Sequence, residues 1–226
     1  HTRLVSDWSS DVCSSAFVCA SAGNFGQGMA YACHQQNIPL TVFAAETASP
    51  LKLERMRQLG ADVQLAGADF DAAKDAGKAY AADHGLPYVE DGREPEVTAG
   101  AGTIGLELSQ YPEPIETLLI PVGNGALING IGTWFKAYSP QTRVIGVVAE
   151  GAPAMEESWR QNRIITTETV NTIADGIGVR IPVPQASELM QTTVDEVLQV
   201  TDKATLGAMR QIHRMAGVVV EPAGAV

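Results

Sequence analysis

The sequence predicts an α/β fold with two domains, in which twisted, mainly parallel sheets are wrapped by helices. Short apolar runs alternate with helix-like patterns along most of the chain. Glycine-rich corners follow two of these apolar runs, as they do where a strand leads into a helix. The 226 residues are 45% hydrophobic and 6% aromatic, which is typical of a globular α/β chain.

The expected elements follow one another in βα order, which indicates parallel strands joined by helices. Strands are expected at 16–20, 40–45, 62–66, 87–90, 117–122, 143–149, 196–200 and 217–220. Helices are expected at 27–36, 50–59, 69–84, 95–110, 126–138, 153–162, 185–191 and 202–215.

A glycine-rich, charged stretch at 90–103 is the predicted domain boundary. It separates a small α/β domain at 16–93 from a large domain at 94–226, which we expect to be incomplete. Residues 1–15 are serine-rich and follow neither the strand nor the helix period, so we interpret them as a foreign or disordered segment.

Charge and cysteine content narrow the class of protein. Fifteen basic residues against 26 acidic ones give a net charge of −11, which argues against a nucleic-acid or anionic-membrane surface. The cysteines Cys13, Cys19 and Cys33 lack zinc-ligand spacing and are typical of core residues in a reduced cytoplasmic protein. We expect no membrane-spanning segment and no signal peptide.

The first glycine-rich corner, Gly23 to Gly28, lies between the apolar run of residues 17–19 and a helical pattern. A helix that begins after such a turn offers unpaired N–H groups and the positive end of its dipole to an anion. The spacing is G-x-x-G-x-G rather than the dinucleotide pattern G-x-G-x-x-G, so a nucleotide is disfavoured. The alternative is a plain structural turn.

A second corner, with Gly123, Asn124, Gly125 and Ala126, joins a buried strand to another helix. Two corners of this kind predict one ligand that is held from both sides of a cleft. The alternative is two independent turns.

Six motifs, in this order, resemble the pyridoxal-phosphate enzymes of the tryptophan-synthase β-like family (fold type II): SAGNFGQG, AGAGTIGLE, PVGNGAL, VVAEGAPAM, TIADGI and VVVEPAGA. The resemblance is greatest to threonine/serine dehydratases and covers residues 16–226. It implies two domains with the cofactor, pyridoxal 5′-phosphate, in the cleft between them, a small amino-acid substrate, and a homo-oligomer when the enzyme is intact.

The resemblance also implies roles for individual residues. Asn24 would contact the 3′-oxygen of the cofactor, and the substrate carboxylate would be held by Ser21, Gly23, Asn24 and Phe25. The family's tetraglycine phosphate loop is matched by Gly123, Asn124, Gly125, Ala126 and Leu127, with two of the glycines replaced. Gly176 and Glu221 would line the same cleft, although Glu221 could equally be a solvated turn residue.

Some relatives bind a cation in the segment that matches VVAEGAPAMEES. The resemblance implies Glu150, the carbonyl of Ala154 and Glu156 as ligands for a divalent or monovalent cation. Oxygen ligands of this type suit hard cations. An acidic helix start is also favoured by the helix dipole alone.

The chain departs from the family at its central catalytic group. The Schiff-base lysine of the family lies in an S-F-K-x-R-G segment upstream of S-x-G-N, and none of the five lysines here has that context: Lys52, Lys74, Lys78, Lys136 and Lys203. The segment that would supply the partner of the cofactor's pyridine nitrogen is missing too. We therefore expect a fragment that is inactive as it stands.

For the intact enzyme the resemblance implies β-elimination from L-threonine or L-serine, which yields a 2-oxo acid and ammonia. Racemases of the family carry a serine where this chain has Ala22, which favours a dehydratase. Two alternatives remain: an enzyme of the threonine synthase or another β-replacement type, and a non-catalytic fragment without the lysine.

Overall fold

The computed structural model describes residues 16–226, so the expectation for residues 1–15 lies outside the described part of the chain. The chain divides into two compact units between Val89 and Glu90. The boundary predicted after residue 93 lies a little further along, in the turn that precedes the first helix of the second unit. Each unit is described separately below.

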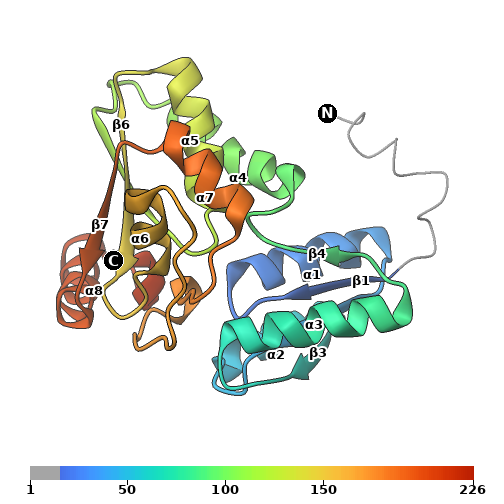
Figure 1. Ribbon diagram of the computed structural model, residues 1–226. Coiled ribbons are helices and arrows are strands. Elements are labelled where there is room, and N and C mark those ends of the chain that lie inside the picture. Colours follow the sequence, from blue (N-terminus) through green and yellow to red (C-terminus); the bar gives the residue numbers. More distant parts are fainter. Residues whose placement is uncertain (1–15) are drawn as a thin grey trace. The chain divides into compact units, whose positions relative to one another are not determined.

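The first unit is a parallel sheet between two layers of helices. Its strands are β1 (Phe17–Ala20), β2 (Leu40–Ala44), β3 (Asp62–Leu65) and β4 (Tyr88–Val89), in the spatial order β3-β2-β1-β4. Its helices are α1 (Asn24–Gln36), α2 (Pro50–Gln58) and α3 (Phe70–His84). Because parallel strands need crossover connections, each helix lies between two consecutive strands of the chain (Figure 1).

Side chains of the central strands alternate between the two faces of this sheet. Cys19 and Val42 pack on the side of α1 and α2, whereas Val18 and Phe43 pack on the side of α3. Both faces are therefore covered, and the two central strands β1 and β2 are mainly apolar and buried.

Two of the three cysteines lie in this core, as the sequence predicts. Cys19 and Cys33 are buried and free, whereas Cys13 lies outside the described residues. Burial raises the pKa of the Cys19 thiol to about 12, with a smaller contribution from Cys33. Both cysteines therefore serve as small apolar core residues.

The second unit contains a three-stranded parallel sheet with the order β5-β6-β7. The strands are β5 (Thr117–Pro121), β6 (Arg143–Ala149) and β7 (Glu196–Val200). The helices are α4 (Pro95–Leu108), α5 (Ala126–Tyr138), α6 (Ala154–Gln161), α7 (Pro184–Thr193) and α8 (Asp202–Ala216), with short 3₁₀ turns η1 (Asp175–Ile177) and η2 (Pro222–Gly224).

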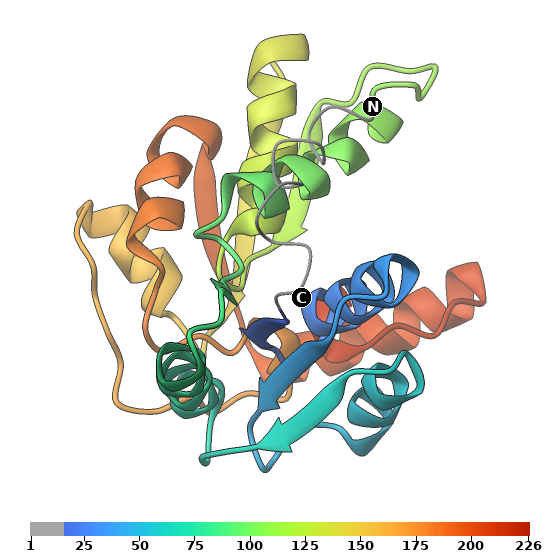
Figure 2. The ribbon, with the colours of Figure 1, turned by 90° about the vertical axis from the view of Figure 1, so that its right-hand side faces the viewer.

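Helices α4 and α5 lie side by side, with their backbones almost in contact (Figures 1 and 2). A Cβ atom on Gly102 would come within 2.9 Å of the carbonyl oxygen of Gly130, and one on Gly105 within 2.9 Å of the Cβ of Trp134. Gly102 and Gly105 of the AGAGTIGLE motif therefore let the two helices approach more closely than a side chain at either position would allow.

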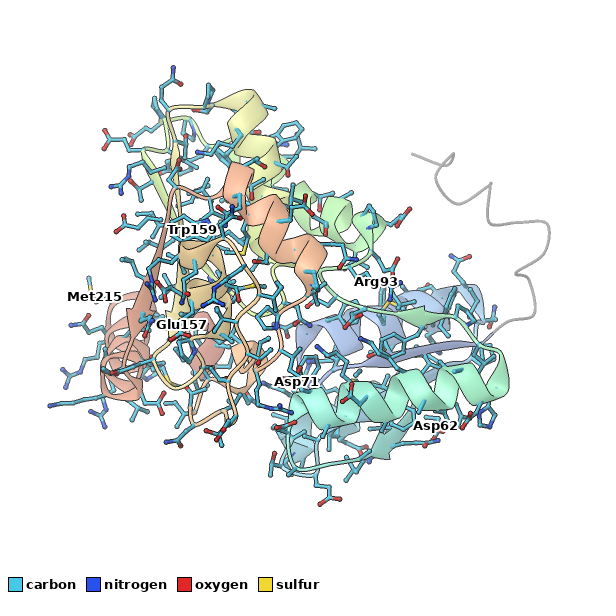
Figure 3. All side chains as sticks on the ribbon, in the orientation of Figure 1. Asp62, Asp71, Arg93, Glu157, Trp159 and Met215 are labelled. Atoms are coloured by element: carbon cyan, nitrogen blue, oxygen red, sulfur yellow. The ribbon has the colours of Figure 1, made fainter. Side chains whose placement is uncertain are left out.

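The predicted α/β class, with parallel sheets wrapped by helices, is confirmed. Two expected elements differ. Helix α1 begins at Asn24, inside the stretch expected to be a corner. Residues 217–220, expected to form a strand, pair with no strand among residues 16–226, and Val219 is 82% exposed. They follow the end of α8, where the side chain of Met215 projects away from the helix (Figure 3).

None of the helices in the described residues is long and apolar enough to cross a lipid bilayer.

Candidate functional site

The loop after β1 places a buried serine beneath the start of α1. Ser21 is 5% exposed, and its Oγ accepts hydrogen bonds from the N–H groups of Gly23, at 3.1 Å, and Gly26, at 2.9 Å. The N-cap residue Gly23 has no side chain that could accept a bond from the helix. The Ser21 hydroxyl, two positions before Gly23, therefore caps the N-terminus of α1 in place of an N-cap side chain.

Gly26 is required by the close packing of this helix start. A Cβ atom at Gly26 would lie 2.6 Å from the sulfur of Met56 and 2.9 Å from the Cβ of Ser21. The N–H group of Phe25 belongs to the first helical turn, and the donors of that turn have no acceptor within the helix itself. Such donors suit a carboxylate, and the role of Ser21, Gly23, Asn24 and Phe25 in binding one stays a prediction.

In the second unit, the glycine-rich loop after β5 leads directly into α5. Gly125 is the N-cap residue, with φ of 95° and no side-chain hydrogen bond to the helix. Glycine adopts this left-handed conformation without steric cost. Asn124, Gly125 and Ala126 are all buried, and the loop presents the positive end of the α5 dipole.

Asn124 carries a buried polar atom whose hydrogen bonding is incomplete. The residue is 5% exposed, and among the described residues its Oδ1 has no hydrogen-bond partner. Asn124 does not adopt a positive φ, so a side chain at this position causes no backbone strain.

Two further predicted site segments lie beside this loop in the same unit. A Cβ atom on Gly123 would lie 3.4 Å from the carbonyl oxygen of Gly176 in η1. A Cβ atom on Gly176 would in turn lie 3.1 Å from the Cβ of Ala223, which follows Glu221 by two residues in η2. The structure thus brings the glycine loop, Gly176 and the segment of Glu221 together, and Glu221 itself is half-buried.

The position of η1 is fixed by the first turn of α8. Asp202 accepts hydrogen bonds from the hydroxyl of Thr172, at 2.6 Å, and from the N–H of Ile173, at 3.1 Å. The Thr172 hydroxyl also accepts a bond from the N–H of Ala174, just before η1. Asp202 was not singled out in the sequence, because nothing local connects it to a loop thirty residues upstream.

The turn before α4 contacts the glycine loop and was missed as a site element. Gly92 has φ of 83°, and a Cβ atom there would overlap the carbonyl oxygen of Asn124. Glu90 is buried, and its carboxylate lies 4.0 Å from the guanidinium of Arg93, which Figure 3 labels. Burial, and secondarily the charge of Glu90, raises the pKa of Asp91 to about 6. The sequence treated this stretch only as a domain boundary.

Asp91→Asn is expected to stabilise the protein at neutral pH. Because the folded pKa of Asp91 is raised from 3.8 to about 6, the native state binds its proton more tightly than the unfolded state does. The contribution of Asp91 to wild-type stability should therefore be fully present below about pH 4 and be lost as the pH rises through about 6, by roughly 2–3 kcal/mol. Urea unfolding between pH 4 and pH 8 measures this, and equal pH profiles for wild type and variant would refute it.

The proposed cation ligands are engaged in hydrogen bonds of their own. The Glu156 carboxylate accepts from Arg160, at 2.9 Å, and from Gln199, at 2.9 Å. The carbonyl of Ala154 accepts from the hydroxyl of Ser158, at 2.7 Å, and Glu150 is exposed. Among residues 16–226 no group of three or more His, Cys, Asp and Glu side chains is arranged to hold a metal ion. The cation site stays a prediction.

The lysines are distributed over four helices. Lys74 is buried in α3, 2.9 Å from Asp71, and Lys136 in α5 lies 2.6 Å from Asp195. The others lie on α2 (Lys52), α3 (Lys78) and α8 (Lys203).

A family model and individual relatives agree on the family that this chain resembles. The model of a family described as "Pyridoxal-phosphate dependent enzyme" matches residues 5–226. An L-threonine ammonia-lyase of Thermotoga maritima is 39% identical over 209 residues, which are 92% of this chain and 52% of that protein. The chain spans about half the length of the curated relatives it matches.

Solved structures with similar folds include the processed form of threonine deaminase isoform 2 from Solanum lycopersicum. It is 31% identical with a TM-score of 0.89, over 99% of this chain and 65% of that one. Maize serine racemase is 29% identical with a TM-score of 0.86, over 94% of this chain and 64% of that one.

Proposed function

We propose that this chain, which belongs to the family of pyridoxal-phosphate dependent enzymes, is part of an enzyme that deaminates L-threonine or L-serine to a 2-oxo acid and ammonia. The observation that carries the proposal is the glycine loop at the start of α5, which has a glycine N-cap and lies against Gly176. The threonine ammonia-lyases and deaminases among the similar proteins support the choice of substrate.

The residues of this loop fit the phosphate of the cofactor. The first-turn N–H groups of α5 have no acceptor within the helix, and the dipole favours an anion at that end. Gly123, Asn124, Gly125, Ala126 and Leu127 would hold the phosphate, and Gly176 and Glu221 would lie along the cofactor. Bound pyridoxal phosphate supplies an electron sink for charge that develops at the substrate α-carbon.

The start of α1 would hold the substrate. The N–H groups of Asn24 and Phe25 would bind its carboxylate, Gly23 lets the ligand approach the backbone, and the side chain of Asn24 would contact the cofactor oxygen. Ser21, whose Oγ already accepts two N–H groups, keeps its own proton to donate to the carboxylate.

The residue after Ser21 supports elimination over racemisation. Racemisation needs a second acid or base on the opposite face of the substrate, and Ala22 has no group that can hold or move a proton. We further propose that the intact enzyme acts in the cytoplasm as a homo-oligomer, and that Glu150, Ala154 and Glu156 bind a cation once Glu156 exchanges its present partners.

The test compares this chain with a version extended at both ends by the matching segments of the Thermotoga maritima relative, including the family's lysine. The chain alone should show no absorbance band of covalently bound cofactor and no ammonia release, because no lysine here occupies the family's position. The extended protein should show both with L-threonine or L-serine.

A lysine-to-alanine variant of the extended protein is the control, and it should lose both signals. Ammonia release by the chain alone would disprove the assignment of the lysine. If the extended protein binds the cofactor but uses only O-phosphohomoserine or another activated substrate, it is a replacement enzyme. This second candidate is favoured by the VGNG sequence of the loop, which resembles that of threonine synthases.

A further inference from the structure

Asn124 differs from the other buried asparagine of the same region in its hydrogen bonding. Asn129, in α5, donates from Nδ2 to the carbonyl of Ala186, at 2.9 Å, and accepts at Oδ1 from the hydroxyl of Thr193, at 2.7 Å. It ties α5 to α7 and is fully used by the fold. Asn124 is also buried, yet within residues 16–226 its Oδ1 contacts no donor.

A buried amide oxygen without a donor costs folding free energy, so native proteins retain one where a ligand or water completes its hydrogen bonding. Asn124 stands directly before Gly125, the N-cap of a 13-residue helix whose first-turn N–H groups lack a capping side chain. The residue with the unpartnered atom and the N-terminal end of the helix therefore lie in the same loop.

The amide of Asn124 can bind either a hydrogen-bond donor or a hydrogen-bond acceptor of a ligand. Oxygen and nitrogen of an asparagine amide occupy nearly equivalent places, and a half turn about the last side-chain bond exchanges the acceptor for an N–H donor. Beside the positive end of a helix, a ligand that carries only acceptors is favoured over one that carries donors. The turned amide then presents Nδ2 to that ligand.

We propose that the side chain of Asn124 is itself a phosphate-binding group, which donates a hydrogen bond from Nδ2 to a phosphate oxygen of the ligand. The inference rests on the proposed function, because it takes that ligand to be pyridoxal phosphate. A loop that has lost two glycines relative to the family thus gains a side-chain donor at one of the changed positions.

The test measures ligand binding rather than turnover, by calorimetric titration of the extended protein, in its lysine-to-alanine form, with pyridoxal phosphate and with pyridoxal. Asn124→Ala keeps the backbone N–H and should weaken pyridoxal phosphate binding about 10-fold. Asn124→Asp keeps the size, replaces a donor by a negative charge, and should weaken binding by at least about 100-fold. Binding of pyridoxal, which lacks the phosphate, should be unchanged in both.

Gln141→Glu, on the exposed turn between α5 and β6, is the matched control for the added charge and should leave both affinities unchanged. Asn124→Ala should not lower the thermal stability of the ligand-free protein, because it removes an unpartnered polar group. Unchanged pyridoxal phosphate affinity in the alanine variant, or an equal loss for pyridoxal, would overturn this inference and leave the proposed function standing. Absence of pyridoxal phosphate binding to the unmutated extended protein would overturn both.

Discussion

Gly130→Ala is expected to destabilise the second unit by about 3 kcal/mol, because backbone atoms of α4 occupy the space that the new methyl group needs. A Cβ atom at Gly130 would overlap the carbonyl oxygen of Thr98 and lie 2.5 Å from the backbone nitrogen of Gly102. Neither atom belongs to a flexible side chain, so α4 and α5 must separate. Urea unfolding followed by tryptophan fluorescence measures the loss, since Trp134 lies at this contact.

Gly100→Ala is the matched control within α4. A Cβ atom there meets no other atom within 4 Å, so alanine adds helix propensity without a clash. The protein should gain about 0.5–1 kcal/mol. If both substitutions destabilise the protein equally, the close approach of α4 and α5 does not explain the glycine at position 130.

The order of the elements could be predicted because each depends on local pattern. Helix α5 begins and ends where the sequence predicts, since the glycines before Ala126 and the proline after Ser139 mark its ends. Strand β6 likewise follows from a single apolar run. Period and turn residues are sufficient where one segment decides its own structure.

The start of α1 was predicted too late because its cap is not local to the helix. The sequence offers Gly23 at the N-cap position, and glycine there gives no side-chain acceptor. The acceptor is Ser21, which is fixed by β1 and reaches the N–H of Gly26 across the loop. The strand predicted at residues 217–220 was wrong for a related reason. A β-branched run favours a strand, but a strand also needs a partner strand, and the described residues supply none.

The parts of the site that escaped prediction depend on contacts between distant segments. Gly92 matters because it rests on Asn124, and Asp202 matters because it holds the loop before η1. Neither has a neighbour in the sequence that points to this role. The two corners, by contrast, were found because a glycine-rich turn between a strand and a helix has a physical meaning that is independent of context.

Gly92→Ala is expected to cost about 3 kcal/mol of stability and to weaken pyridoxal phosphate binding in the extended protein. The positive φ of 83° contributes about 1–2 kcal/mol with any L side chain. The remainder arises because the methyl group would displace the carbonyl of Asn124. Since that carbonyl belongs to the loop before α5, its displacement also moves the N–H groups proposed to hold the phosphate.

Gly217→Ala separates these two contributions, because Gly217 also has a positive φ, of 68°, but a Cβ atom there meets nothing within 4 Å. This control should lose only about 1–2 kcal/mol, measured by urea unfolding, and should bind pyridoxal phosphate as the unmutated protein does. The difference in stability between the two variants then measures the contact of Gly92 with the glycine loop. If Gly92→Ala and Gly217→Ala lose the same stability and the same affinity, the turn before α4 does not support the phosphate loop, and the close packing seen at Asn124 has no part in binding.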